Sequence, residues 1–192
     1  HNTYNKSDEY HKFDKLISIS KAVQDFTVNQ GFESVVADNG VTVSSILNRE
    51  SKPFEDGKLH FIQVSRLDIA QKGQDILLKA LGIVKADFRI DNFMMHFVGN
   101  GADEEKLKMM TRELGIESNV VFEGLKDQMW VYSNLCNFDL FIQPSRFEGF
   151  GLTVAEAIAA KVPVLVSNIE GPLEIIDGGR LGMTFENENS LD

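Results

Sequence analysis

Two carboxylates, Glu148 and Glu156, stand eight residues apart on either side of the glycines Gly149 and Gly151. An apolar run ended by proline precedes them and predicts a buried strand, and good helix formers over 152–160 predict a helix. A helix N-terminus that follows glycines offers unpaired backbone N–H groups and the positive end of the helix dipole. The segment therefore predicts a turn that binds an anion. A plain tight turn carrying two surface glutamates has the same spacing.

Two cations follow the apolar segment 58–64, which predicts another strand. Arg66 and Lys72 lie in the loop between this strand and a helix expected over 74–84. A forked guanidinium and a compact ammonium are well suited to bind the oxygens of a diphosphate. The alternative is a solvated pair that caps the helix.

Four blocks of sequence occur in a recognisable order. They are the paired glutamates and, before them, residues 65–68 (SRLD) with 72–73 (KG), residues 96–101 (HFVGNG) and residues 121–125 (VFEGL). Together they resemble the donor-binding half of a retaining glycosyltransferase of family 4, whose signature is a Glu, seven residues and a second Glu. The resemblance extends over residues 59 to 185. It implies an α/β fold with a Rossmann-like, doubly wound parallel sheet, which is one half of a GT-B fold.

The resemblance also implies roles for the charged residues. Glu148 would position the donor sugar and stabilise charge, while Arg66 and Lys72 would bind the diphosphate that leaves. Glu156 would accept hydrogen bonds from the ribose diol. The donor would be a UDP-, GDP- or ADP-sugar, and the sequence does not predict which base.

Backbone groups complete the implied site. The N–H groups that would bind sugar and phosphate are those of Gly149, Phe150, Gly151 and Leu152. Gly99 and Gly101 would form a wall beside the nucleotide, and Leu125 would lie near the base. The sequence has no Asp-x-Asp pattern, so we expect no metal and no cofactor. His96 lies in an apolar run and is expected to be a hydrogen-bonded core histidine, and His60 has no partner at metal-ligand spacing.

Composition narrows the partners. The chain has 192 residues, of which 19 are basic and 29 acidic, so its net charge of −10 argues against nucleic acid. The apolar runs, such as 162–166, are far shorter than the ~20 residues of a membrane span. We therefore expect a cytoplasmic protein, with peripheral membrane contact left open. Cys136 is expected to be a small buried residue.

Strands and helices alternate from residue 58 onward, which predicts βαβ units with ligands at the carboxyl ends of the strands. Residues 1–46 differ, since a strand over 16–20, a helix over 21–28 and a strand over 34–37 resemble the tail of an acceptor-side domain with its hinge. Residues 47–57 form a predicted linker. Residues 58–192 form the predicted donor domain, cut short where 189–191 would begin another helix.

The sequence thus predicts the donor-binding part of a retaining hexosyltransferase that transfers a hexose from a nucleotide-sugar to a glycan or lipid-linked acceptor. The acceptor would bind through the missing N-terminal domain, so we expect the 192-residue chain alone to be inactive. Two alternatives remain open, a non-catalytic module that binds a nucleotide-sugar and another GT-B enzyme such as a sugar-nucleotide epimerase.

Overall fold

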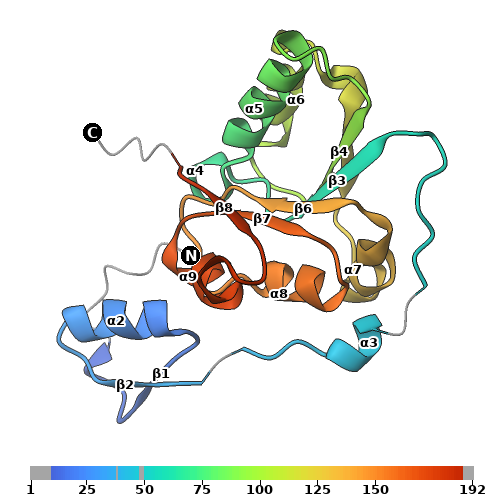
Figure 1. The fold of residues 1–192 in the computed structure, drawn as a ribbon. Helices are drawn as coiled ribbons and strands as arrows, with labels where there is room; N and C mark the ends of the chain where they lie inside the picture. The colour runs from blue at the N-terminus through green and yellow to red at the C-terminus, as the bar shows by residue number, and fades with distance from the viewer. Residues whose placement is uncertain (1–9, 38, 48–49, 188–192) are drawn as a thin grey trace.

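The computed structural model describes residues 10–37, 39–47 and 50–187. A six-stranded sheet in the order β5-β4-β3-β6-β7-β8 forms its centre, and every neighbouring pair is parallel (Figure 1). Its strands are β3 (Leu59–Val64), β4 (Phe93–Val98), β5 (Val120–Gly124), β6 (Leu140–Gln143), β7 (Val164–Ser167) and β8 (Met183–Phe185). The strand order reverses between β3 and β6, which confirms the predicted doubly wound sheet and places a crevice at the carboxyl ends of these two strands.

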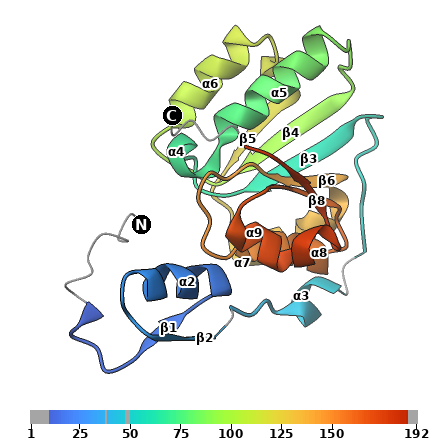
Figure 2. The same ribbon diagram turned by 60° about the vertical axis from the view of Figure 1, so that its left-hand side comes forward.

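Helices cover both faces of the sheet (Figures 1 and 2). One face carries α5 (Gln74–Ala86) and α6 (Glu104–Glu113), and the other carries α7 (Gln128–Asn134), α8 (Leu152–Ala159) and α9 (Glu170–Ile175). Short 3₁₀ turns, η1 (Glu117–Asn119), η2 (Leu135–Asn137) and η3 (Asp177–Gly179), lead into or follow these elements. Because both faces are buried, the strands are apolar along most of their length, as a parallel sheet requires.

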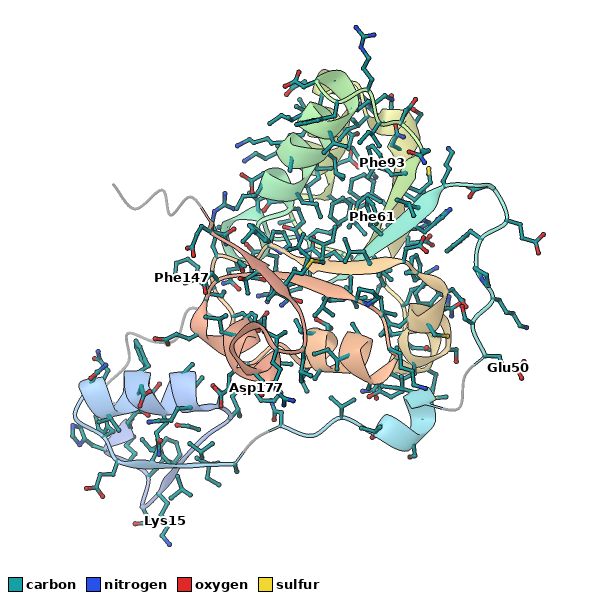
Figure 3. All side chains as sticks on the ribbon, in the orientation of Figure 1. Lys15, Glu50, Phe61, Phe93, Phe147 and Asp177 are labelled. Atoms are coloured by element: carbon teal, nitrogen blue, oxygen red, sulfur yellow. The ribbon has the colours of Figure 1, made fainter. Side chains whose placement is uncertain are left out.

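Each helix layer has its own hydrophobic core. Leu78 and Leu107 pack against Phe93 under α5 and α6, and Val154 packs on the opposite face under α8. The rings of Phe61 and Phe93 are nearly parallel at an angle of 11°, with centroids 6.2 Å apart, inside the first layer (Figure 3). Complete burial of such a side chain contributes about 1.5–3 kcal/mol, so the two layers hold the strand ends firmly in place.

The N-terminal elements form a separate two-stranded parallel sheet of β1 (Leu16–Ser18) and β2 (Ser34–Val36), covered by α2 (Lys21–Asn29) (Figure 1). The chain then passes through α3 (Val43–Leu47), which the sequence did not predict, beneath α7 and α8. Ile46 of α3 is buried in the core of that layer at 2% exposure. A second unpredicted helix is α4 (Ile69–Lys72), where Asp68 accepts from Gln71 N as the N-cap.

The predicted division into 1–46, 47–57 and 58–192 remains a prediction. Residues 1–9, 38, 48–49 and the helix start expected at 189–191 lie outside the described residues. Among the helices that the structure describes, none has the length and apolar character needed to cross a bilayer.

Candidate functional site

The loops after β3 and β6 touch through their backbones. A Cβ atom on Gly73 would lie 1.9 Å from the carbonyl oxygen of Pro144, and Gly73 adopts φ +65°. The backbone N–H groups of Arg146 and Phe147 donate to the carbonyl of Gln71, at 2.8 and 3.2 Å. The two predicted polar segments, about 75 residues apart in the chain, therefore form one structure at the switch point.

An Arg–Asp clamp, which the sequence analysis missed, reinforces this contact. Arg146 binds Asp75 of α5 through two hydrogen bonds of 2.7 and 2.9 Å and also donates to the carbonyl of Ile69 at 2.8 Å. Burial alone would raise the pKa of the Asp75 carboxyl, but the hydrogen bonds and charge of Arg146 outweigh it and lower that pKa. Arg146 is thus committed to the scaffold. The sequence gives little indication of this role, since Arg146 is one arginine in a loop, two residues after a proline.

The structure brings Lys72 and Glu148 together. The Nζ atom of Lys72 lies 2.6 Å from Oε2 of Glu148, and the two side chains are only 16% and 17% exposed. Gln143, the last residue of β6, donates to the same oxygen at 2.9 Å. A predicted phosphate-binding cation and a predicted sugar-binding carboxylate therefore form an ion pair with each other.

Arg66 is the more exposed cation. Its side chain is 56% exposed, its guanidinium donates to Oε1 of Gln71 at 2.9 Å, and Asp68 lies 3.9 Å away. Both contacts are at the surface, so a ligand with more negative charge can replace them at small cost.

A cleft of about 890 Å³ opens beside these residues. From the six-stranded domain it is lined by Val64, Ser65, Arg66, Gln71, Lys72, Gln143, residues 146–153, Ile169 and Glu170. Its opposite wall comes from the N-terminal elements, through Ile19, Ala22, Val23, Phe26 and Asn39. Phe147 projects at this end of the sheet and is 61% exposed (Figure 3). The volume is that of a typical small-molecule site.

A hydrogen bond ties the two walls together. Ser20 is fully buried, accepts from Val23 N at 3.1 Å as the N-cap of α2, and donates to the carbonyl of Gly149 at 2.6 Å. The backbone N–H of Lys21 adds a bond to the carboxylate of Glu174 at 3.1 Å. The sequence analysis missed Ser20, although a serine before a helix is a recognisable N-cap.

The glycine loop has the predicted strand–turn–helix form. Gly151 adopts φ +100° as the N-cap of α8 without a side-chain cap, whereas Gly149 does not take a positive φ. The first backbone N–H groups of α8 therefore have no partner within the helix. Gly149, Phe150, Gly151 and Leu152 all line the cleft, although Phe150 is largely buried at 7% exposure and Leu152 is 40% exposed.

Gly99, Gly101 and Leu125 are not among the residues that line the cleft. A Cβ atom on Gly99 would lie 2.0 Å from the carbonyl oxygen of Ser65, and one on Gly101 would lie 2.1 Å from that of Leu67. These glycines let the loop after β4 support the loop that carries Arg66. Leu125 is 72% exposed.

Glu156 also lies away from the lining of the cleft, at 8% exposure on the buried side of α8. Burial raises the pKa of its carboxyl, and hydrogen bonds from Tyr132 and Gln128 partly oppose that shift. The predicted carboxylate pair thus splits into Glu148 at the cleft and Glu156 inside the domain.

The buried histidines of β3 and β4, His60 and His96, link two less buried carboxylates in a chain of polar contacts. Asp56 contacts His60 at 3.0 Å, His60 contacts His96 at 2.9 Å, and His96 contacts Glu123 at 2.9 Å. The ring of Phe54 stacks on His60 with centroids 3.6 Å apart. Burial lowers the pKa of His96, against the opposing effect of Glu123. His96 is therefore the hydrogen-bonded core histidine that the sequence predicted.

Within the part of the chain that the structure describes, no group of three His, Cys, Asp or Glu side chains is placed to hold a metal ion. Cys136 is partly buried rather than fully buried.

Comparison with known proteins identifies the family. A family model described as "Glycosyl transferases group 1" matches residues 44–192. The chain belongs to the glycosyl transferases of group 1. This glycosyl transferase chain is 28% identical over 179 residues to a lipopolysaccharide 1,6-galactosyltransferase of Salmonella typhimurium, covering 90% of the chain and 48% of that relative. It spans about half the length of the curated relatives it matches.

Solved structures share the arrangement. The apo form of the lipopolysaccharide outer core galactosyltransferase WaaB matches with a TM-score of 0.72 and 28% identity over 92% of this chain and 49% of its own. Anabaena Alr3699/HepE in complex with UDP and glucose matches with a TM-score of 0.80 over 95% of this chain and 52% of its own. At 22% identity the second match shows the fold alone. This group 1 glycosyl transferase therefore has the Rossmann-like domain of a GT-B protein.

Proposed function

We propose that this chain is the donor-binding part of a retaining hexosyltransferase of family 4, transferring a hexose from a nucleotide-sugar to a glycan or lipid-linked acceptor. One observation carries the proposal. A cleft at the switch point of the sheet contains Arg66, the Lys72–Glu148 ion pair and an uncapped helix N-terminus. Family membership and relatives named as galactosyltransferases support the same reaction class.

Arg66 and Lys72 bind the diphosphate in this proposal. Breaking the bond between sugar and diphosphate adds negative charge to the leaving group, so cations placed beforehand stabilise the transition state. The N-terminus of α8 adds backbone N–H donors from Gly151 and Leu152. No step requires a metal ion or cofactor.

Glu148 orients the hexose and stabilises positive charge on the sugar. Its Oε2 atom is already held by Lys72 and Gln143, which suits a positioning group better than a nucleophile. Retention then proceeds by front-face reaction within an ion pair. For Glu156 to bind ribose, ribose hydroxyls must exchange with the hydrogen bonds of Tyr132 and Gln128.

The proposal extends to the domain boundaries, the location and the activity of the chain alone. Residues 1–46 are the acceptor-side tail with its hinge, 47–57 the linker and 58–192 the donor domain of a cytoplasmic enzyme that can be membrane-peripheral. The chain covers 48% of its galactosyltransferase relative. Transfer needs an acceptor held at the anomeric carbon with water excluded, so the chain alone binds donor without transferring sugar.

Calorimetry tests the proposal. UDP, GDP and ADP, each with and without a conjugated glucose, are titrated into the chain, and at least one pair is expected to bind. Arg66→Ala is expected to weaken a nucleoside diphosphate more than its monophosphate. Arg112→Ala is the matched control, because Arg112 pairs with Glu117 on the surface of α6 outside the cleft lining. Absence of binding by all six compounds refutes the proposal.

A further inference from the structure

Gln143 is a buried amide at the floor of the cleft. It ends β6, is 2% exposed and lines the cleft together with Glu148. Burying an amide costs free energy unless its polar atoms find partners. The hydrogen-bond partners of the Gln143 amide therefore indicate the role of this side chain.

The hydrogen bonds of Gln143 allow one orientation of the amide. Glu148 Oε2 lies 2.9 Å from one terminal atom of Gln143, and Thr153 Oγ1 lies 3.0 Å from the other. A carboxylate paired with an ammonium only accepts hydrogen bonds, so the NH₂ group must face Glu148. The carbonyl oxygen then faces Thr153, whose hydroxyl donates to it.

This bridge spans the loop that carries Glu148. Gln143 ends β6 and Thr153 is the second residue of α8, so the loop between the two elements is 144–151. One carboxylate oxygen, Oε2, thereby receives two donors, from Lys72 and Gln143. Within the described residues, no hydrogen bond reaches Oε1. The second oxygen of Glu148 is left to accept from a ligand.

We propose that Gln143, oriented by Thr153, is a positioning residue that holds Glu148 so that its Oε1 atom binds one hydroxyl of the donor hexose. The inference rests on the proposed function and deepens it. Lys72 sits on a flexible stem and fixes distance poorly by itself, whereas the planar amide fixes direction. Gln143 and Glu148 therefore determine recognition of the hexose, and Arg66 and Lys72 determine recognition of the diphosphate.

Thr153→Val separates these two functions. It preserves the shape of Thr153 but removes its hydroxyl, so the carbonyl oxygen of Gln143 loses its donor and the amide plane beside Glu148 is held from one side only. If Glu148 is no longer aimed at the sugar, the hydrogen bond between its carboxylate and the hexose hydroxyl is weakened, which predicts affinity for the glucose conjugate about tenfold lower. Affinity for the nucleoside diphosphate should change by less than about twofold. Thr153→Ser is expected to restore binding of the conjugate. UDP, GDP and ADP and their glucose conjugates are first titrated into the unsubstituted chain, and the variants are then compared with the nucleotide that binds.

A control variant and a second variant of Gln143 separate an effect on sugar binding from a general effect on folding. Thr111→Val removes the hydroxyl of a buried threonine outside the cleft lining, which donates to the carbonyl of Lys108 on α6, and is expected to change neither affinity. Gln143→Glu keeps the size of the side chain but places two carboxylates at hydrogen-bond distance, where they share one proton. Binding of the glucose conjugate is then expected to become pH-dependent between about pH 5 and 8, a property that a structural amide would not produce.

The outcomes distinguish a failure of donor binding from a failure of the positioning role of Gln143. If no nucleotide binds the unsubstituted chain, the proposed function fails and the inference fails with it. If nucleotides bind but Thr153→Val weakens both probes equally, or neither, Gln143 does not position Glu148 for the sugar. An unchanged pH profile for Gln143→Glu leads to the same conclusion.

Discussion

Replacing Glu148 by glutamine is expected to strengthen binding of a nucleoside diphosphate. In the structure the ammonium of Lys72 is neutralised by the Glu148 carboxylate at 2.6 Å, and both side chains are mostly shielded from water. A diphosphate that binds Lys72 must share the ammonium with this carboxylate and meets its negative charge. Glu148→Gln removes the charge while keeping the length of the side chain.

The magnitude follows from Coulomb's law. Two like unit charges about 5 Å apart, at an effective dielectric constant of about 20, repel by about 3 kcal/mol. Screening by salt and rearrangement of Lys72 reduce this gain to about 1–2 kcal/mol, or about 5–30-fold in affinity. For the hexose conjugate, loss of the charged hydrogen bond to the sugar costs about 1.5–3 kcal/mol and cancels or reverses the gain.

Calorimetry with the diphosphate and its conjugate at two salt concentrations measures both effects. The expected result is tighter binding of the diphosphate but unchanged or weaker binding of its conjugate, with the gain for the diphosphate shrinking at high salt. Glu105→Gln is the control, because Glu105 pairs with Lys108 on the exposed face of α6. Weaker diphosphate binding by Glu148→Gln would refute the competition for Lys72.

Three further predictions concern stability. Burial raises the pKa of Glu156, so the contribution of this side chain to the free energy of unfolding is greatest below about pH 4.5 and declines as the pH rises. Glu156→Gln should therefore have a higher melting temperature than the unsubstituted chain at about pH 8, and no higher one at about pH 4. Burial lowers the pKa of His96, so the free energy of unfolding should fall as the pH decreases from about 6.5, and His96→Gln should flatten that slope in urea titrations at several pH values. Gly73→Ala should lower the free energy of unfolding by more than about 2 kcal/mol, because the added Cβ would collide with the carbonyl oxygen of Pro144. Gly124→Ala should cost about 1 kcal/mol, because Gly124 has φ +70° but open space around it. Equal melting temperatures for the two variants would contradict the contact between Gly73 and Pro144.

The pattern of elements followed from the sequence because it is a local property. Alternating apolar runs and helical periodicity depend on residues a few positions apart, so the alternation of strands and helices from residue 58 onward was predicted, and the helices expected over 74–84 and 152–160 are α5 and α8 with ends shifted by one or two residues. The helices α3 and α4 were missed. Their four or five residues are too few for a periodic signal, and burial of Ile46 and capping by Asp68 stabilise them instead.

The roles predicted for the glycines illustrate a second limit. A glycine in the sequence indicates close approach of the backbone to something, but it does not say to what. The carbonyl oxygens of Ser65 and Leu67 lie where Cβ atoms of Gly99 and Gly101 would be, so one neighbour of each glycine is the protein itself. The wall beside a nucleotide that the resemblance implies for these glycines stays a prediction.

The sequence by itself determined the α/β class and placed Arg66, Lys72 and Glu148 at the carboxyl ends of strands. Parallel strands connected by helices bring such ends to one edge, whatever their order. Tertiary structure alone decided that β3 lies beside β6, and hence that Lys72 meets Glu148, while Glu156 turns into the core. The reason is physical: these contacts depend on strand order and on which face of α8 is buried, and both arise from packing between segments distant in the chain.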